Sequence, residues 1–210
     1  MTRPETTPPS VPTPPLRATD LLLIRHAPAD NGGLLAGRRD VGALLPGAAE
    51  LEARRQLIGV PDRLITSPAR RCQMTLAALF GTAPATGRAT EDARLWEQDF
   101  GLWEGISPAD LPDLGPLSRD ALAQHRPPQG ESFADLCTRV TPGLIAAASG
   151  GRVAVVAHAG VIRAALSWAL GVPSAGLGFE IAPLSVTLIR VLPEAEALTF
   201  SVAYVNRSAA

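Results

Sequence analysis

Lysine is absent from this 210-residue chain, and all 19 basic residues are arginines. A P-loop requires a lysine for the nucleotide phosphates, so P-loop chemistry is excluded. Covalent catalysis through a lysine Schiff base is excluded for the same reason. With 20 acidic residues the formal net charge is −1. A charge so close to zero does not suit a general nucleic-acid or anionic-membrane surface, and we expect neither as a partner.

Cysteine is nearly as scarce, with only Cys72 and Cys137 in the chain. Two cysteines cannot form a zinc-finger cage or a disulfide framework, so we expect free thiols and a cytoplasmic location. The N-terminus lacks the basic-then-apolar pattern of a signal peptide. One stretch, Val153–Val172, is apolar enough to imitate a membrane span, but it contains His158 and Arg163. A strand followed by a buried helix explains this stretch better.

Proline is concentrated at the N-terminus, where residues 1–19 hold six prolines mixed with threonine and show no apolar periodicity. We expect this segment to be a disordered tail. The globular domain is expected to span residues 20–210. At this size folding buries roughly 70% of the surface of the unfolded chain, which is enough for a core without disulfides or metals.

Short apolar runs alternate with helical patterns along the rest of the chain, which predicts an α/β layered fold with a mixed sheet. In the second helix we expect Ser67 as the N-cap and Pro68 at the first position. In the third helix we expect a disturbance at Pro142. The last two strands are expected to pair near the edge of the sheet. The expected strands are 21–24, 63–66, 152–157, 185–191 and 198–205, and the expected helices are 46–59, 67–80, 131–149 and 160–170.

Two of the three histidines stand just past the ends of apolar, strand-like runs. His26 follows the first expected strand and His158 follows the third. Ligands of open α/β sheets bind at the carboxyl ends of the strands, so both imidazoles are expected at one edge of one sheet. The alternative is that both are ordinary residues at strand ends. His125 lies in a polar, proline-rich stretch, and we assign it no role.

Arginines lie beside the first of these histidines and at the start of an expected helix. Arg25 precedes His26, and Arg70 and Arg71 fall in the first turn of the second expected helix. The helix dipole disfavours arginine at this end, unless a bound anion sits there between guanidinium and backbone N–H groups. The alternative is a pair of solvated surface charges, which is more plausible for Arg70 than for Arg71. Two histidines among arginines favour a phosphoryl site over a metal site, because a divalent cation prefers carboxylates.

A leaving alkoxide needs a proton, so we expect a carboxylic acid close to the phosphoryl site. The segment LWEQDFGLWEG, residues 95–105, supplies Glu97, Asp99 and Glu104 in an aromatic setting. Its aromatic rings would partly desolvate a neighbouring carboxyl group. The alternative is an acidic loop packed by its tryptophans, and composition alone does not choose among the three acids.

Five segments together resemble the histidine phosphatase family, in its phosphoglycerate-mutase-like branch. LLLIRHA is similar to the family's Arg-His-Gly opening, and TSPARRCQMT is similar to its second-arginine motif. LWEQDFGLWEG resembles the acid motif, PPQGES resembles the Pro-Gly-Gly-Glu-Ser segment, and VAVVAHAGVIRAAL resembles the second-histidine motif. The resemblance covers residues 20–210 and keeps the family's order. It implies a three-layer α/β/α sandwich with a mostly parallel mixed sheet.

The resemblance also implies a mechanism. His26 would attack phosphorus and become phosphohistidine, while Arg25, Arg71 and His158 would bind the phosphoryl oxygens. Glu97 would protonate the leaving oxygen and then activate the water that frees phosphate. The nucleophile would carry its proton on the other ring nitrogen, which would donate it to a backbone carbonyl in a hydrogen bond. No metal and no cofactor is implied, and the partner would be a small phosphorylated substrate.

The family likeness extends to the rim of the expected pocket, with some departures. The loop Gly37–Leu44 retains the family's glycine and aspartate, and the resemblance implies that Gly37, Arg38 and Ala159 also contact the substrate. The usual glycine after the nucleophile is Ala27 here. The family's frequent asparagine has no aligned match: Asn31 is displaced by one position, and we assign it no role. These departures bear on the shape of the substrate more than on the reaction.

Among subgroups the chain most resembles the α-ribazole phosphatases of cobalamin biosynthesis and their relatives. This resemblance implies a phosphomonoesterase acting on a small ester such as α-ribazole 5′-phosphate. Mutases of the family usually carry paired arginines in an insertion, whereas Arg119 and Arg126 are separated here. Hydrolysis is therefore favoured over a mutase-type transfer. A phosphate-binding module without turnover is the third reading.

Overall fold

The computed structural model describes residues 17–81, 89–194 and 197–209. Most of the expected N-terminal tail, residues 1–16, lies outside the described residues. The expected boundary at residue 20 is slightly late, because Thr19 is fully buried and is the first residue of the first strand. The Thr19 hydroxyl accepts a hydrogen bond from the backbone of Gly150 at 2.7 Å, which ties the start of the domain to the neighbouring strand.

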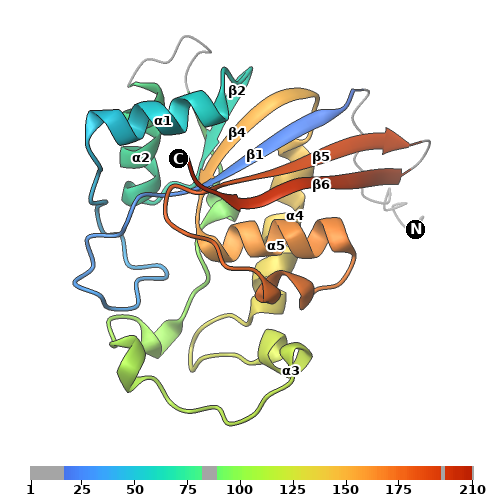
Figure 1. Ribbon diagram of the computed structural model, residues 1–210. Coiled ribbons are helices and arrows are strands. Elements are labelled where there is room, and N and C mark those ends of the chain that lie inside the picture. The colour runs from blue at the N-terminus through green and yellow to red at the C-terminus, as the bar shows by residue number, and fades with distance from the viewer. Residues whose placement is uncertain (1–16, 82–88, 195–196, 210) are drawn as a thin grey trace, which may run out of the picture.

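One six-stranded sheet forms the middle of the molecule, in the order β3-β2-β4-β1-β5-β6 (Figure 1). The pairs β1–β4, β2–β4 and β2–β3 are parallel, and β5 and β6 are antiparallel additions. The expected pairing of the last two strands near a sheet edge is therefore correct. The strands are β1 Thr19–Arg25, β2 Arg63–Thr66, β3 Thr90–Glu91, β4 Gly151–Ala157, β5 Val186–Glu194 and β6 Ala197–Arg207.

Helices cover both faces of this sheet, so the expected α/β/α sandwich with a mostly parallel sheet is confirmed (Figure 1). Helices α1 and α2 pack on one face, and α4 and α5 pack on the other. The short helix α3 lies away from the sheet (Figure 1). The helices are α1 Ala48–Ile58, α2 Arg70–Phe80, α3 Arg119–Gln124, α4 Phe133–Ala147 and α5 Ala159–Leu170.

The apolar run in β1 shows why the sequence reads as a buried parallel strand. Leu21 and Leu23 belong to the core on the α4–α5 side, and Leu22 and Ile24 belong to the core on the α1–α2 side. Each of the four side chains is at most 1% exposed. A central strand covered on both faces has no solvent side, so its sequence is continuously apolar and does not alternate.

Two helix expectations need correction. Helix α2 begins at Arg70 with Ala69 as the residue before it, so Ser67 is not the N-cap. Asp40, from a distant loop, accepts the backbone N–H of Arg70 at 2.7 Å instead. Helix α4 runs without interruption through Pro142. Its start is fixed by a reciprocal capping box in which Ser132 is the N-cap.

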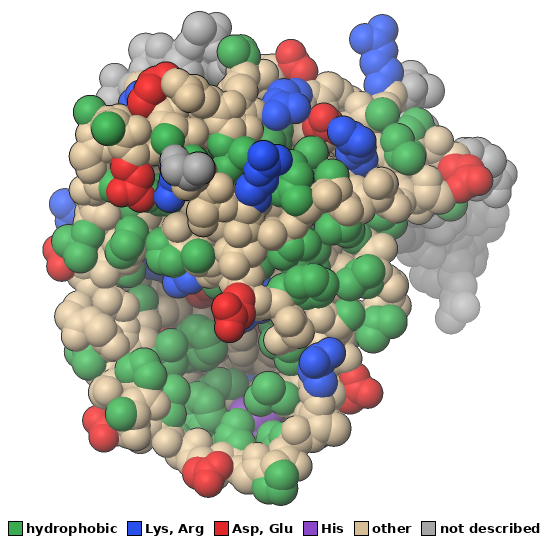
Figure 2. Space-filling model, in the orientation of Figure 1, with side chains coloured by type: hydrophobic (Ala, Val, Ile, Leu, Met, Phe, Trp, Pro, Cys, Tyr) green, Lys and Arg blue, Asp and Glu red, His purple; other side chains and the backbone are tan. Residues whose placement is uncertain are grey.

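A lobe of short turns and α3, residues 92–130, extends beyond the carboxyl edge of the sheet (green to yellow in Figure 1). Figure 2 shows this face of the molecule hollowed between the sheet and the lobe, with hydrophobic side chains over much of the hollow. The apolar stretch Val153–Val172 forms β4 and α5, as expected. Among the described residues no helix has both the length and the apolar character that a membrane span requires.

Candidate active site

Two histidines meet at the carboxyl edge of the sheet. His26 follows β1 and His158 follows β4, and these strands are parallel neighbours in which Arg25 pairs with Ala157. The backbone N–H of His26 donates to the Ala157 carbonyl at 2.9 Å, which joins the two strand ends. The imidazole centroids lie 5.1 Å apart with an interplanar angle of 69°. The structure thus brings together two side chains that are far apart in the sequence.

The His26 ring is held in one tautomer. Its Nδ1 lies 2.6 Å from the carbonyl of Ala27, and a carbonyl only accepts, so Nδ1 carries the proton. The unprotonated Nε2 accepts a 3.3 Å hydrogen bond from Arg71 Nε. Burial lowers the pKa of His26 to about 3, opposed by the Ala27 hydrogen bond and reinforced by Arg71 and Arg25. At neutral pH the ring is therefore uncharged, with a nucleophilic lone pair on Nε2.

His158 is buried completely and is contacted on several sides. Its Nε2 lies 2.8 Å from Ser67 Oγ and 3.5 Å from Cys72 Sγ, and the Trp96 ring stacks on it at 6.3 Å and 8°. Burial lowers the pKa of His158 well below its usual range, and nearby positive charge, first that of Arg71, lowers it further. Burial also raises the pKa of the Cys72 thiol. Both groups are thus neutral at neutral pH.

Arg71 is the most deeply buried charge of the site, at 1% exposure. From the first turn of α2 its Nη1 donates to the carbonyl of Arg39 and its Nη2 to the carbonyl of Gly37, at 3.0 and 2.8 Å. These bonds attach the Gly37 loop to the helix and direct Nε toward the nucleophilic ring. The neighbouring Arg70 side chain is exposed, so only one of the two adjacent arginines enters the site.

Arg25 supplies a second guanidinium from the end of β1. Its Nη1 donates to the carbonyl of Ile181 at 2.5 Å, whereas its buried Nε has no partner among the described residues. Burial lowers the pKa of this guanidinium, Glu97 raises it, and Arg163 and Arg71 lower it. A buried donor beside other positive charges is suited to an anionic acceptor.

The three candidate acids have different surroundings in the structure. Asp99 accepts the backbone N–H of Gly101 at 2.8 Å and so closes a turn. Glu104 accepts two consecutive backbone N–H groups, at 2.7 and 2.8 Å, in the loop Gly37–Leu44. Of these three, only Glu97 lines the same cavity as His26. Of the three carboxyl groups, Glu97 is thus the one placed to exchange a proton with a ligand.

Arg139 of α4 holds the backbone that carries Glu97. Its guanidinium donates to the carbonyls of Arg94, Trp96 and Glu97, at 2.7, 3.1 and 3.2 Å. It also pairs with the Glu131 carboxylate at 2.5 Å. The segment PPQGES, to which Glu131 belongs, therefore supports the acid from a distance and does not contact the cavity itself.

Gly160 leaves the space that the Glu97 carboxylate occupies. The backbone N–H of Gly160 donates to Glu97 Oε2 at 3.2 Å, and a Cβ added to Gly160 would overlap with Glu97 Oε1. We expect G160A to displace the acid and to lower kcat/KM, which reports the step that releases the leaving group, about 100-fold for alkyl phosphates, whose leaving group needs the proton. For p-nitrophenyl phosphate, whose leaving group is already acidic, the loss should be several-fold smaller. Equal losses for both substrates would contradict this role.

The cavity in front of the histidine pair has a volume of about 330 Å³. Gly37 and Ala159 line it, as the family likeness implies, but Arg38 does not. The Arg38 guanidinium lies over the Trp96 ring, 5.6 Å from its centroid. His125 stands apart, stacked on an aromatic ring of the lobe. The residues that line the cavity come mainly from the end of β1 and the loop that follows it, from α2 and α5, and from the lobe. His158 lies behind His26 and is not among them.

Several residues of this region were not assigned to the site from the sequence. Among them, Asn31 and Arg163 line the cavity, and Ser67 contacts His158. Arg163 follows Ala159 by one helical turn and so shares its face of α5, which is a periodicity the sequence does contain. Asn31 and Ser67 reach the site through loop conformations that no local pattern specifies.

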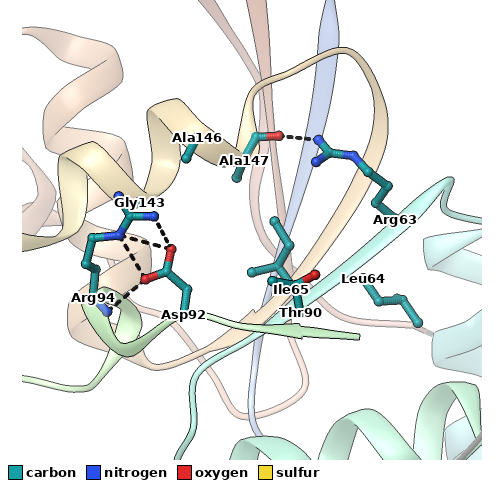
Figure 3. Close-up of a pocket in the computed structure, with 9 residues that line it drawn as sticks. All are labelled: Arg63, Leu64, Ile65, Thr90, Asp92, Arg94, Gly143, Ala146 and Ala147. Carbon is teal, nitrogen blue, oxygen red and sulfur yellow. Dashed lines mark hydrogen bonds and ion pairs between the residues drawn. The ribbon is translucent and has the colours of Figure 1, made fainter. Parts of the chain in front are cut away.

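A second cavity of about 320 Å³ lies beside β3, the outer strand on one side of the sheet, and against α4 (Figure 3). Its charged groups already have partners: Arg94 pairs with Asp92 at 2.6 Å, and Arg63 donates to the carbonyl of Ala147 at 2.6 Å. None of the site histidines lines it. In residues 17–81, 89–194 and 197–209, no three histidine, cysteine, aspartate or glutamate side chains cluster as a metal site would need.

The free energy of unfolding is expected to fall as the pH falls from about 6.5 toward about 3. Below about pH 6.5 the unfolded chain binds protons on His26 and His158, whereas both rings stay unprotonated in the folded protein. Each of these histidines therefore lowers the free energy of unfolding by about 1.4 kcal/mol per pH unit. Urea unfolding at about pH 7.5 and about pH 5.5 measures this slope. The variant H26N should show a smaller pH dependence than the parent protein. The same slope in both proteins would contradict the lowered pKa of His26.

Comparison with known protein families agrees with this geometry. Residues 21–202 match the model of the histidine phosphatase superfamily (branch 1). The chain belongs to this superfamily. The resemblance seen in the five sequence segments is thus confirmed. One relative is named as a phosphatase, which agrees with the expectation of an enzyme of the phosphoric monoester hydrolase type.

Two curated relatives illustrate the similarity. A protein of Mycobacterium tuberculosis (strain H37Rv), named bifunctional protein Rv2228c, is 34% identical over 194 residues, which is 80% of this chain and 50% of the relative. The chain thus spans half of that relative's length. A glucosyl-3-phosphoglycerate phosphatase of Mycolicibacterium vanbaalenii is 30% identical over 180 residues, covering 75% of this chain and 77% of that protein.

Solved structures of this superfamily share the fold. Mycobacterial hydrolase 2 superposes with a TM-score of 0.78 at 26% identity, over 93% of each chain. A mycobacterial glucosyl-3-phosphoglycerate phosphatase gives 0.76 at 24% identity, over 91% of this chain and 100% of that one. A proposed alpha-ribazole-5′-P phosphatase of Escherichia coli K-12 gives 0.71 at 22% identity, over 90% and 98%. At these identities the last two show the fold alone.

Proposed function

We propose that the protein hydrolyses small phosphate monoesters through a phosphohistidine on His26, without a metal ion. The observation that supports this most is the pair of imidazoles 5.1 Å apart, of which His26 donates its Nδ1 proton to the Ala27 carbonyl and keeps Nε2 unprotonated beside Arg71. Arg25 and Arg71 bring two positive charges to the same cavity. This arrangement fits a tetrahedral anion attacked in line by an imidazole.

The reaction would proceed in two steps. In the first, His26 Nε2 forms a bond to phosphorus while the bond from phosphorus to the ester oxygen breaks, and Glu97 gives its proton to the leaving oxygen. In the second, Glu97 takes a proton from water, whose oxygen attacks phosphorus and displaces the imidazole. Arg25, Arg71 and His158 would stabilise the charge on the phosphoryl oxygens in both steps.

A mutase-type transfer is the runner-up reaction, and the arginines of the lobe do not favour it. Neither Arg119 nor Arg126 lines the cavity. Arg126 instead forms an ion pair with Asp135 at 2.7 Å. An isomerised ester in place of free phosphate as the product would establish the transfer reading. Phosphate binding without hydrolysis across a panel of substrates would establish the third reading, a binding module.

Two compounds named for similar proteins are candidate substrates: α-ribazole 5′-phosphate and glucosyl-3-phosphoglycerate. Activity on α-ribazole 5′-phosphate would place the enzyme in cobalamin biosynthesis. The cytoplasmic location stays a prediction. Release of inorganic phosphate from p-nitrophenyl phosphate in the presence of a chelator tests the reaction itself. Turnover that is lost with the chelator and restored by a divalent cation would overturn the metal-independent mechanism.

A further inference from the structure

The cavity contains one guanidinium for which the two-step reaction has no use. Arg163 projects from α5 and lines the cavity together with Arg25, Arg71 and Glu97. Its Nε donates to the carbonyl of Phe179 at 2.9 Å. Among the described residues neither Nη atom of Arg163 has a hydrogen-bond acceptor, and no carboxylate forms an ion pair with it.

Arg163 and Arg25 are anchored on the same short segment. Arg25 Nη1 donates to Ile181, two residues beyond the carbonyl that Arg163 Nε uses. Both guanidinium groups are thus attached to the segment 179–181, and both line the same wall of the cavity.

The charges of this wall exceed what a phosphoryl group alone requires. Arg25 and Arg71 already face the nucleophilic side, whereas Glu97 is the one carboxylate among the residues that line the cavity. Burial lowers the pKa of Arg25, Glu97 raises it, and Arg163 lowers it again. Three guanidinium groups and a single carboxylate line the cavity, so Glu97 offsets only part of the positive charge. Neighbouring guanidinium groups with such an excess of positive charge are stabilised when an anion binds between or beside them.

We propose that Arg163 binds a second anionic group of the substrate, a carboxylate or a further phosphate, on the leaving-group side of the ester. The inference rests on the proposed phosphatase function and adds a substrate class to it. The preferred substrate is then a phosphomonoester whose alcohol carries a negative charge a few bonds from the ester oxygen. The apolar side chains of Phe133 and Leu177, which also line the cavity, would cover the carbon skeleton between the two charges.

A matched pair of substrates tests this subsite. 3-Phosphoglycerate and glycerol 3-phosphate differ only by a carboxylate in place of a hydroxymethyl group. We expect the wild-type protein to favour 3-phosphoglycerate in kcat/KM by about ten- to a hundredfold, the range of a charge-assisted hydrogen bond. In R163M the ratio of the two kcat/KM values should fall to about one, because kcat/KM for 3-phosphoglycerate falls while kcat/KM for glycerol 3-phosphate stays unchanged. R163K should retain part of it.

Controls separate this subsite from general electrostatics and from the reaction itself. R190M removes the same charge at an exposed position of β5 far from the cavity and should leave the preference unchanged. Binding of both compounds to H26A and to H26A/R163M by calorimetry gives the preference without turnover. If the wild-type protein releases no phosphate but H26A binds 3-phosphoglycerate preferentially, the proposed function fails and the subsite stands.

Two results would overturn the subsite. One is an equal loss in R163M for both glycerol derivatives and for p-nitrophenyl phosphate, because Arg163 would then serve the phosphoryl group. The other is the absence of any preference in the wild-type protein, both in turnover and in the binding of H26A. Thermal unfolding of R163M near the wild-type temperature ensures that a loss of preference reports on the charge and not on folding.

Discussion

The variant H26A is expected to hydrolyse p-nitrophenyl phosphate about 10⁴- to 10⁶-fold more slowly than the wild-type protein, as when a covalent nucleophile is removed from a site that acts as a unit. Without the imidazole there is no Nε2 lone pair in front of Arg71, and water would have to attack directly. Arg25 and Arg71 would still bind the phosphoryl group, so KM should change much less than kcat. Initial rates with the chelator present measure both constants.

The chain offers a natural control for this variant. Of its three histidines, His125 lies away from the cavity against the ring of Trp103, so H125A should keep its rate within about twofold. Circular dichroism and thermal unfolding of both variants show whether each is folded. Full activity in folded H26A would mean that the nucleophile is not His26 and would remove the basis of the proposed reaction.

The variant E97Q is expected to divide the reaction into a fast and a slow step. The amide is nearly isosteric with the acid but cannot give or take the proton. Hydrolysis of an alkyl phosphate should fall by about 10²- to 10⁴-fold, because its leaving oxygen needs protonation. With p-nitrophenyl phosphate the first step needs no acid, so one equivalent of nitrophenol should appear rapidly, followed by slow turnover.

The slow phase has a distinct cause, because water must attack the phosphohistidine without a base. Stopped-flow absorbance measures the burst and the steady rate in one experiment. D99N is the matched control: Asp99 accepts a backbone N–H in a turn, which an amide oxygen still does, so its kinetics should resemble those of the wild-type protein. A steady rate in E97Q equal to that of the wild-type protein would exclude Glu97 as the acid and base.

The central sheet and the paired histidines could be predicted because their signals are local. Leu21–Ile24 is continuously apolar since both faces of β1 are covered, and the same holds for β4 before His158. A polar residue directly after each such run must then lie at the carboxyl edge. The adjacency of β1 and β4 is a matter of strand order, which no single segment contains, so the sequence predicted a common edge for the two histidines but not that their strands are neighbours.

The remainder of the site depends on contacts between distant segments. Asp40 accepts the backbone N–H of Arg70 at the start of α2, whereas the Ser67 hydroxyl accepts the N–H of Ala69 and contacts His158. Glu104 and Glu97 lie in one motif, yet one of them anchors a loop near residue 38 while the other enters the cavity. Composition treats these carboxyl groups as equivalent, and only the folded lobe distinguishes them. Lobe residues 92–130 contain little regular structure, so periodicity carries little information there.

The identity of the residue that carries the phosphoryl group tests the central claim most directly. Wild-type protein mixed with p-nitrophenyl phosphate and quenched with alkali during turnover, alongside E97Q treated in the same way, is digested and examined by mass spectrometry. The mechanism predicts one phosphoryl group on His26, labile in acid, stable in alkali and more abundant in E97Q. Turnover with no phosphorylated histidine in either protein, or with the phosphoryl group on another residue, would contradict it.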